Sequence, residues 1–166
     1  MKIFRFLLAP ILGLVVFMFT VGGIEAIGQR LYPPSAEVTD FSIQITDAAR
    51  RQDQAAILEI RPKLDAAMST YLQTAPLGAL VFVVFAWIAS AFLGGLVAAG
   101  VAPVLKVPMA IFIGFMDVSG IVLVTLQLKH PIWMPIVGMV GALALAWLAG
   151  WWQANRARRM KQPVEA

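Results

Sequence analysis

Apolar residues gather into four long runs along the chain, separated by one long polar stretch and two short breaks. A helix rises about 1.5 Å per residue, so about 20 apolar residues are needed to cross a hydrocarbon core of about 30 Å. Each run is close to this length. The pattern predicts four membrane-spanning helices, at residues 5–28, 76–102, 107–127 and 132–152.

The first run follows Lys2 and Arg5, a charged start that secretory signal peptides share. A signal peptide has an apolar core of only about 7–15 residues and small side chains before its cleavage site. Here the apolar run is longer, and Ile24 occupies the position where cleavage after Ala26 requires a small side chain. We therefore predict a retained first span.

The long polar stretch lies between the first and second spans, at residues 29–75. Two consecutive prolines near its start end the first helix at Tyr32, because a residue before proline disfavours the helical conformation. Beyond Asp47 the apolar residues follow helical spacing. They are Ile57, Ile60, Leu64, Ala67 and Tyr71. Pro62 lacks an amide donor and should split or kink this helix. We predict a solvated, helical cap.

The composition favours one membrane domain spanning residues 1–166. Hydrophobic residues make up 60% of the chain and charged residues 13%, whereas soluble domains have roughly 45–50% and 25%. A soluble fold of this size could not cover so much apolar surface. The predicted fold class is all-α, an integral membrane four-helix bundle with a helical extracytoplasmic loop.

Lysine and arginine residues favour one side of the membrane. Four spans place both termini on the same side, which collects Lys2, Arg5, Lys106 and the basic tail at residues 153–166. The other side holds Lys129 and the long loop, in which acidic and basic residues nearly balance. The positive-inside rule therefore predicts cytoplasmic termini and an outer loop. Because these charges lie beside apolar runs, the net charge of +4 does not indicate a nucleic-acid partner.

Several kinds of chemistry find no support in the sequence. The chain has no cysteine and one histidine, which excludes thiolate and multi-histidine metal sites within one chain. It lacks phosphate-binding glycine loops, the G-x-S-x-G nucleophile motif and the H-E-x-x-H zinc motif. We therefore expect no cofactor, no metal ion and no enzymatic activity. A membrane enzyme acting on lipid or quinone is the least favoured class.

Asp117 is the only ionisable residue well inside an apolar run. A carboxylate there costs at least ~2.5–3.5 kcal/mol, so it should face the bundle or a wet cavity. Ser90 lies at a similar depth on the second span, and Trp87, one turn away, carries an indole donor. One interpretation is a proton or cation transfer step. The favoured one is a protonated Asp117 whose hydrogen bond locks the second and third spans together.

A second polar group is expected at the outer membrane boundary. It consists of Glu25, Arg30, Lys129 and His130. Histidine changes charge in the physiological range, so a Glu–His or Glu–Lys pair could bind a ligand, sense pH or hold a metal with outside help. The favoured interpretation is an ion pair that closes the bundle.

Small residues recur every four positions on the second and fourth spans. Ser90, Gly94 and Ala98 form one row, and Gly138, Ala142, Ala146 and Gly150 form the other. This spacing lets helix backbones approach closely. We favour packing within the chain; a homo-oligomer or a docked partner helix is the alternative.

Five phrases of the sequence carry a resemblance. They are EAIG at 25–28, LYPP at 31–34, APLGA at 75–79, AFLGGLVAA at 91–99 and HPIW at 130–133. Together they resemble a group of small bacterial four-span membrane proteins with no assigned function, over most of the chain except residues 36–60. The resemblance implies four spans and a bacterial inner-membrane location, and it implies no activity. It places motif positions at Glu25, Tyr32, Pro33, Pro34 and His130.

The absence of catalytic motifs and the abundant close-packing surface favour a non-enzymatic membrane protein. We expect an accessory subunit, or a component that assembles or organises others, with the lipid bilayer and a larger membrane protein or a second copy as partners. The alternative is a small oligomeric transporter or channel. It would use Asp117 and Ser90 inside the membrane, and Glu25 and His130 at its outer mouth.

The charge asymmetry predicts the topology. A reporter enzyme that works only in the cytoplasm should be active when it is inserted at Lys106. A reporter enzyme that works only outside the cytoplasm should be active when it is inserted at Arg50. Enzymatic reporters with opposite compartment requirements measure this. A cytoplasmic reporter signal at Arg50 would overturn the predicted orientation.

Overall fold

The computed structural model describes residues 2–160, and within this range the chain forms six helices and no strand. The helices are α1 (Lys2–Leu31), α2 (Ala36–Arg50), α3 (Gln54–Thr74), α4 (Leu77–Val101), α5 (Lys106–Gln127) and α6 (Trp133–Arg159). Helices α1, α4, α5 and α6 are long and apolar enough to cross a membrane, and they pack together. The predicted all-α bundle with four candidate spans is confirmed.

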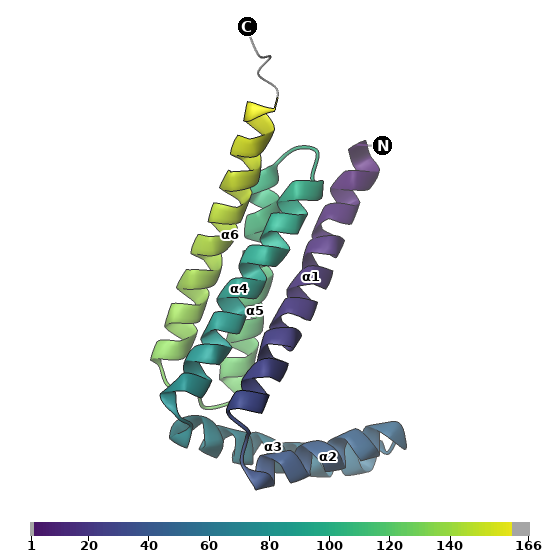
Figure 1. Cartoon of the computed structure of the whole chain (residues 1–166). Helices are drawn as coiled ribbons and strands as arrows, with labels where there is room; N and C mark the ends of the chain where they lie inside the picture. The colour runs from purple at the N-terminus through teal and green to yellow at the C-terminus, as the bar shows by residue number, and fades with distance from the viewer. Residues whose placement is uncertain (1, 161–166) are drawn as a thin grey trace, which may run out of the picture.

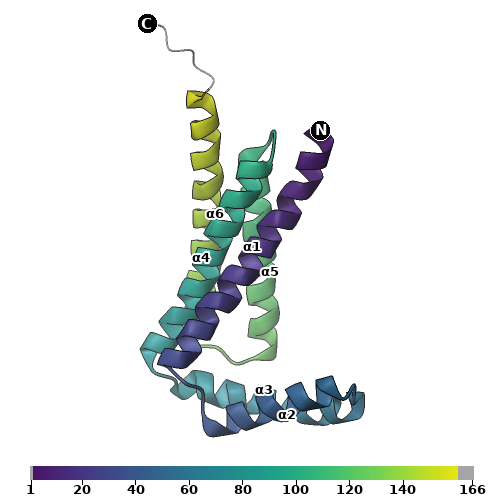
Figure 2. The ribbon, with the colours of Figure 1, turned by 45° about the vertical axis from the view of Figure 1, so that its right-hand side comes forward.

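The long helices run roughly alongside one another, with both chain ends at one end of the bundle (Figure 1). The connection between α4 and α5 lies at that same end. At the opposite end α2 and α3 lie side by side across the bundle and extend beyond it, as both views show (Figures 1 and 2). We call these two helices the cap.

Helix α4 is the centre of the bundle, because α1, α5 and α6 all pack against it. Glycines let α1 approach α4 very closely. A Cβ atom placed on Gly94 would lie 2.7 Å from the carbonyl oxygen of Gly13 and 2.9 Å from Cβ of Phe17. Ala98 lies in the same contact, since a Cβ atom on Gly13 would be 2.7 Å from its Cβ. The small residues Gly94 and Ala98 of α4 therefore pack against α1 of the same chain.

The small residues of α6 are also buried inside the bundle. A Cβ atom on Gly138 would lie 2.6 Å from the ring of Trp87 on α4. One on Gly150 would lie 2.7 Å from Cα of Val107 on α5. Ala142 and Ala146, between them, are fully buried. This row therefore packs α6 against α4 and α5 and is not exposed to a second copy.

The cap departs from the predicted helix that began near Asp47. Its first helix, α2, begins at Ala36, where Ser35 caps the amide of Val38. It ends at Arg50, where the chain turns. Asp53 then caps α3 by accepting a hydrogen bond from the amide of Ala56. Helix-capping side chains, not the apolar spacing alone, thus set where the two helices begin.

Of the two predicted effects of Pro62, a split or a kink, the split is wrong, because α3 continues through the proline. Proline removes one hydrogen bond to the carbonyl four residues earlier, which belongs to Leu58. Both residues are exposed, so water can hydrate that carbonyl. Packing of α3 against α2 supplies the remaining stability.

The fourth span continues beyond the predicted end at Trp152. Helix α6 reaches Arg159, and it carries Arg156, Arg158 and Arg159 in its last turn. Positive side chains are favourable there, because carbonyl groups at a helix C-terminus carry partial negative charge. The rest of the predicted tail, residues 161–166, lies outside the described residues.

The close contact between α1 and α4 predicts that Gly94→Leu destabilises the bundle. The added side chain would collide with the backbone of α1, and overpacking of this kind costs about 1–3 kcal/mol or more. Reversible unfolding in mixed micelles would measure the loss. Gly23→Leu on α1 is the control, because nothing lies within 4 Å of its Cβ position. Equal stability of the two variants would contradict the packing described here.

Candidate functional site

A cavity of about 770 Å³ lies between the cap and the adjacent end of the bundle. Its walls come from α1, from both cap helices, from α4 and α5, and from the connection between α5 and α6. Pockets that bind small molecules typically have volumes of roughly 300–1,000 Å³. The cavity is therefore large enough to hold a ligand.

The wall formed by α1 and α4 depends on two glycines. A Cβ atom on Gly28 would lie 2.8 Å from Cδ1 of Phe82, so only glycine allows this approach. The ring of Tyr32 lies directly against Gly78, at the start of α4. These two contacts hold the end of α1 close to α4, and they place Glu25 at the wall of the cavity.

The connection between α5 and α6 contributes His130. Its Nδ1 lies 2.9 Å from the carbonyl oxygen of Leu128. A carbonyl can only accept, so Nδ1 carries the proton, and Nε2 of the neutral ring keeps a lone pair. The connection is also tied to the cap, because the amide of Lys129 donates to Oγ of Ser69 at 3.3 Å. The imidazole thus has a defined position, 6.1 Å from the Trp87 ring.

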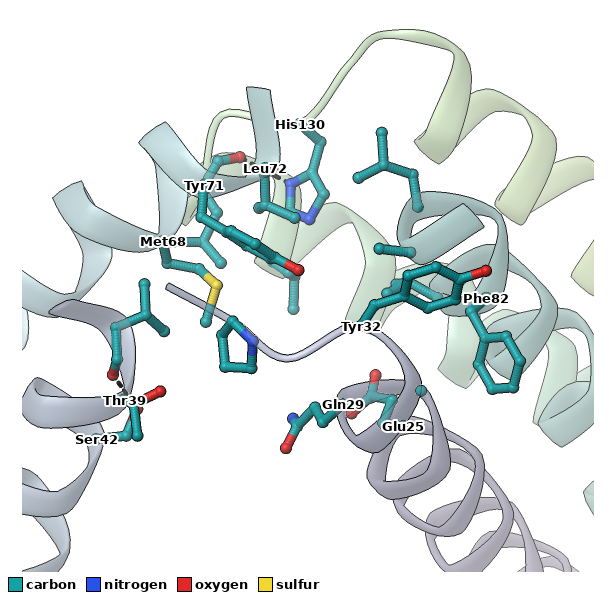
Figure 3. A pocket seen from close by; sticks show the side chains of 18 of the residues that line it. Glu25, Gln29, Tyr32, Thr39, Ser42, Met68, Tyr71, Leu72, Phe82 and His130 are labelled. Carbon is teal, nitrogen blue, oxygen red and sulfur yellow. Dashed lines mark hydrogen bonds between the residues drawn. The ribbon is translucent and has the colours of Figure 1, made fainter. Parts of the chain in front are cut away.

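Polar and apolar groups both line the cavity. Its apolar lining includes side chains such as Leu72, Leu80, Val83 and Trp87. His130 and Tyr71 lie on one side of the space, and Glu25 and Gln29 lie on the opposite side (Figure 3). Hydroxyl groups of α2 add to the polar lining. They belong to Thr39, Ser42 and Thr46.

The structure brings only part of the predicted outer group together. Glu25 and His130 both line the cavity. Arg30 is exposed and outside it, and Lys129 lines a separate, smaller hollow. Within residues 2–160 Glu25 makes no ion pair, so the favoured interpretation, an ion pair that closes the bundle, is wrong. The physical reason is spatial, because the cavity separates α1 from the connection that carries His130.

Asp117 lies elsewhere, inside the bundle. It is 2% exposed, and its Oδ2 has no hydrogen-bond partner among the described residues. The hydroxyl of Ser90 donates to the carbonyl of Trp87 at 2.8 Å instead. The predicted hydrogen bond between the second and third spans is therefore absent in the described chain. The turns of α5 on either side of Asp117 face α6. Gly114 lies against Ala146, and Ile121 lies near Gly138, which also contacts Trp87 of α4.

The apolar pattern of the chain did not predict that α2 contributes to the cavity. Thr39, Ser42 and Thr46 are spaced by three and four residues, so they share one face of a helix. The polar stretch before Asp47 was not recognised as helical, although Ser35 and Glu37 are typical of a helix start. Tyr71 was assigned only to the helical pattern. Its position in the cavity depends on how the cap lies on the bundle.

Comparisons with protein-family models, with curated proteins and with solved structures find no match to this chain. The resemblance to small bacterial four-span proteins therefore stays a prediction. In the structure, residues of four of its five phrases line the cavity or contact its walls. They include Gly28, Tyr32, Gly78, Ala79 and His130.

The separation of the cavity from the bundle interior can be tested by labelling, because the chain has no cysteine. We expect Ser42→Cys to react with a water-soluble maleimide, since the residue lines an open cavity. Ser90→Cys should not react in the folded protein, because Ser90 is fully buried. Mass spectrometry after timed labelling compares the two. Equally fast reaction would show that water reaches the interior near Ser90.

Proposed function

We propose that this protein is a non-enzymatic component of the membrane, and that the cavity beneath the cap binds an amphiphilic lipid. The observation that carries the proposal is the cavity itself, whose mainly apolar lining also contains carboxyl, imidazole and hydroxyl groups. A lipid combines the same two kinds of group, an apolar chain and a polar headgroup.

The lining of the cavity supports a lipid as the occupant. The apolar run of α1 ends at Ile24, so Glu25 marks the boundary between hydrocarbon and headgroup region. Leu80, Val83 and Trp87 of the apolar helix α4 line the cavity together with Glu25. The cavity therefore has both span residues and a polar group in its lining. An acyl chain bound there would contact Leu80 and Trp87 rather than water.

Binding is favoured over catalysis by the state of the one imidazole in the cavity. General acid–base catalysis needs a base within hydrogen-bond reach of a reacting group. In the described chain, the hydrogen bond of His130 is made with the backbone carbonyl of Leu128. No hydroxyl group of the described residues is hydrogen-bonded to it, so Nε2 is available to a bound molecule.

A lipid-binding protein without catalytic groups would hold or organise lipid for other membrane components. This fits an accessory or assembly role in a bacterial inner membrane. The charge distribution supports cytoplasmic termini, because Lys2, Arg5, Lys106 and the last turn of α6 lie at one end of the bundle. The cap and its cavity would then face the outer side.

Transport is the second candidate, and Asp117 is the observation that favours it. A buried carboxyl group without a hydrogen-bond partner is costly, and such residues in membrane spans commonly mark ion or proton pathways. A four-helix chain is thin for a pore, so this function would need an oligomer.

Asp117→Asn separates the two candidates. The change removes the ionisable proton and keeps the shape, so a proton-coupled transporter should lose at least 90% of its flux. A lipid-binding protein should keep its lipid affinity within about twofold, because Asp117 does not line the cavity. Proton flux in reconstituted vesicles and lipid binding in detergent measure these outcomes. Measurable flux lost on substitution would favour transport.

Filling the cavity tests lipid binding directly. Ser42→Trp should reduce lipid binding at least tenfold, because the indole would occupy space that the ligand needs. Gln44→Trp is the matched control, since this exposed position on the same helix does not line the cavity. Native mass spectrometry of the delipidated protein with added phospholipid measures the bound fraction. Equal binding by the two variants would overturn the proposal.

A further inference from the structure

The part of the cavity lining nearest the bundle has an acidic side chain and no lysine or arginine. Its charged lining residues are Glu25, Asp47 and Arg50. The last two belong to the end of α2 that lies farthest from the bundle, and they pair with each other at 3.8 Å. Glu25 remains, without an ion pair among the described residues. The bundle end of the cavity therefore carries a carboxyl group that no basic side chain of its lining neutralises.

Hydrogen-bond acceptors surround the same space. The oxygens of Glu25 lie on the α1 side, and His130 and Tyr71 face them from the other side (Figure 3). Because Nδ1 of His130 donates to Leu128, its Nε2 can only accept in the neutral ring. The hydroxyl of Tyr71 can also accept. Donor groups of a bound molecule would find acceptors on both sides of this space.

Aromatic rings complete the lining. Tyr32, Tyr71 and Trp87 all contribute to the walls. The face of an aromatic ring carries partial negative charge and attracts cations, most strongly when water is excluded. Rings and acceptors thus favour the same kind of group, which is positively charged.

We propose that the cavity selects lipids whose headgroup ends in a primary ammonium group. This inference rests on the proposed lipid binding. A primary ammonium has three N–H donors, and the acceptors in the lining that such donors can use include Glu25, Nε2 of His130 and the hydroxyl of Tyr71. A quaternary ammonium carries the same charge but has no N–H donor. An anionic headgroup would be repelled by Glu25.

The test compares phosphatidylethanolamine with phosphatidylcholine carrying identical acyl chains. The two lipids differ only in methylation of the amine. A difference between their dissociation constants therefore reports on the amine and not on the phosphate or the acyl chains. The full-length protein is delipidated in detergent, and native mass spectrometry measures the dissociation constant of each lipid. Hydrogen bonds to charged groups are worth about 1.5–3 kcal/mol, so we expect a preference for phosphatidylethanolamine of about tenfold or more. Phosphatidylglycerol should bind more weakly than phosphatidylethanolamine.

Two variants locate the preference. Glu25→Gln is nearly isosteric and should bring the ratio of the two dissociation constants close to one. Glu59→Gln is the matched control and should leave the ratio unchanged. Glu59 is exposed on α3, outside the cavity, where a hydrogen bond and the positive charge of Lys63 lower its pKa.

Each outcome is decisive. Equal affinity for the two lipids, a preference for phosphatidylglycerol, or an unchanged ratio in Glu25→Gln would overturn the headgroup inference. If Ser42→Trp nevertheless blocks all three lipids, lipid binding in the cavity still stands. If Ser42→Trp blocks none of them, both proposals fall. Free ethanolamine, which has no acyl chain, should not compete at millimolar concentration, and competition would overturn the assignment to a lipid.

Discussion

Helices in a bilayer gain little by exchanging lipid contacts for protein contacts, so they associate where their backbones can approach closely. In this protein that constraint is met around α4. Gly94 lies against the backbone of Gly13 on α1, and Gly138 of α6 lies against Trp87 on α4. The positions of α1 and of the α5–α6 connection follow from these contacts. The walls of the cavity that belong to the bundle therefore depend on small residues buried between its helices.

The cap is stabilised by different interactions from the bundle, because it lies beyond the ends of the spans, where water can hydrate backbone groups. Its helices begin at capping side chains, Ser35 and Asp53. The amide of Lys129 donates to Ser69 and joins the cap to the bundle. A cap held at its bundle end leaves space beneath α2. This arrangement brings hydroxyl groups of α2 and the carboxyl group of Glu25 into the same cavity as apolar side chains of the bundle.

The two polar positions identified from the sequence illustrate what residue type can and cannot predict. An ionisable residue within an apolar run must be buried in the bundle, and Asp117 is buried. The predicted hydrogen bond from Asp117 to the second span was wrong, because Ser90 donates to the backbone carbonyl of Trp87 on α4 instead. Glu25 and His130 were expected to lie at the same end of the spans, and both line one cavity there instead of forming an ion pair. Depth follows from position along a span, whereas pairing depends on side-chain direction.

The sequence by itself determined the four apolar helices and the end of the first helix at the prolines after Tyr32, because run length and proline geometry are local properties. The small-residue spacing also predicted close packing. Only the tertiary structure decided that α2 is a helix lying over the bundle end, and that Tyr71 and His130 face Glu25. These contacts join residues far apart in the chain. Their formation depends on helix crossing and on the direction of the cap, which no local pattern encodes.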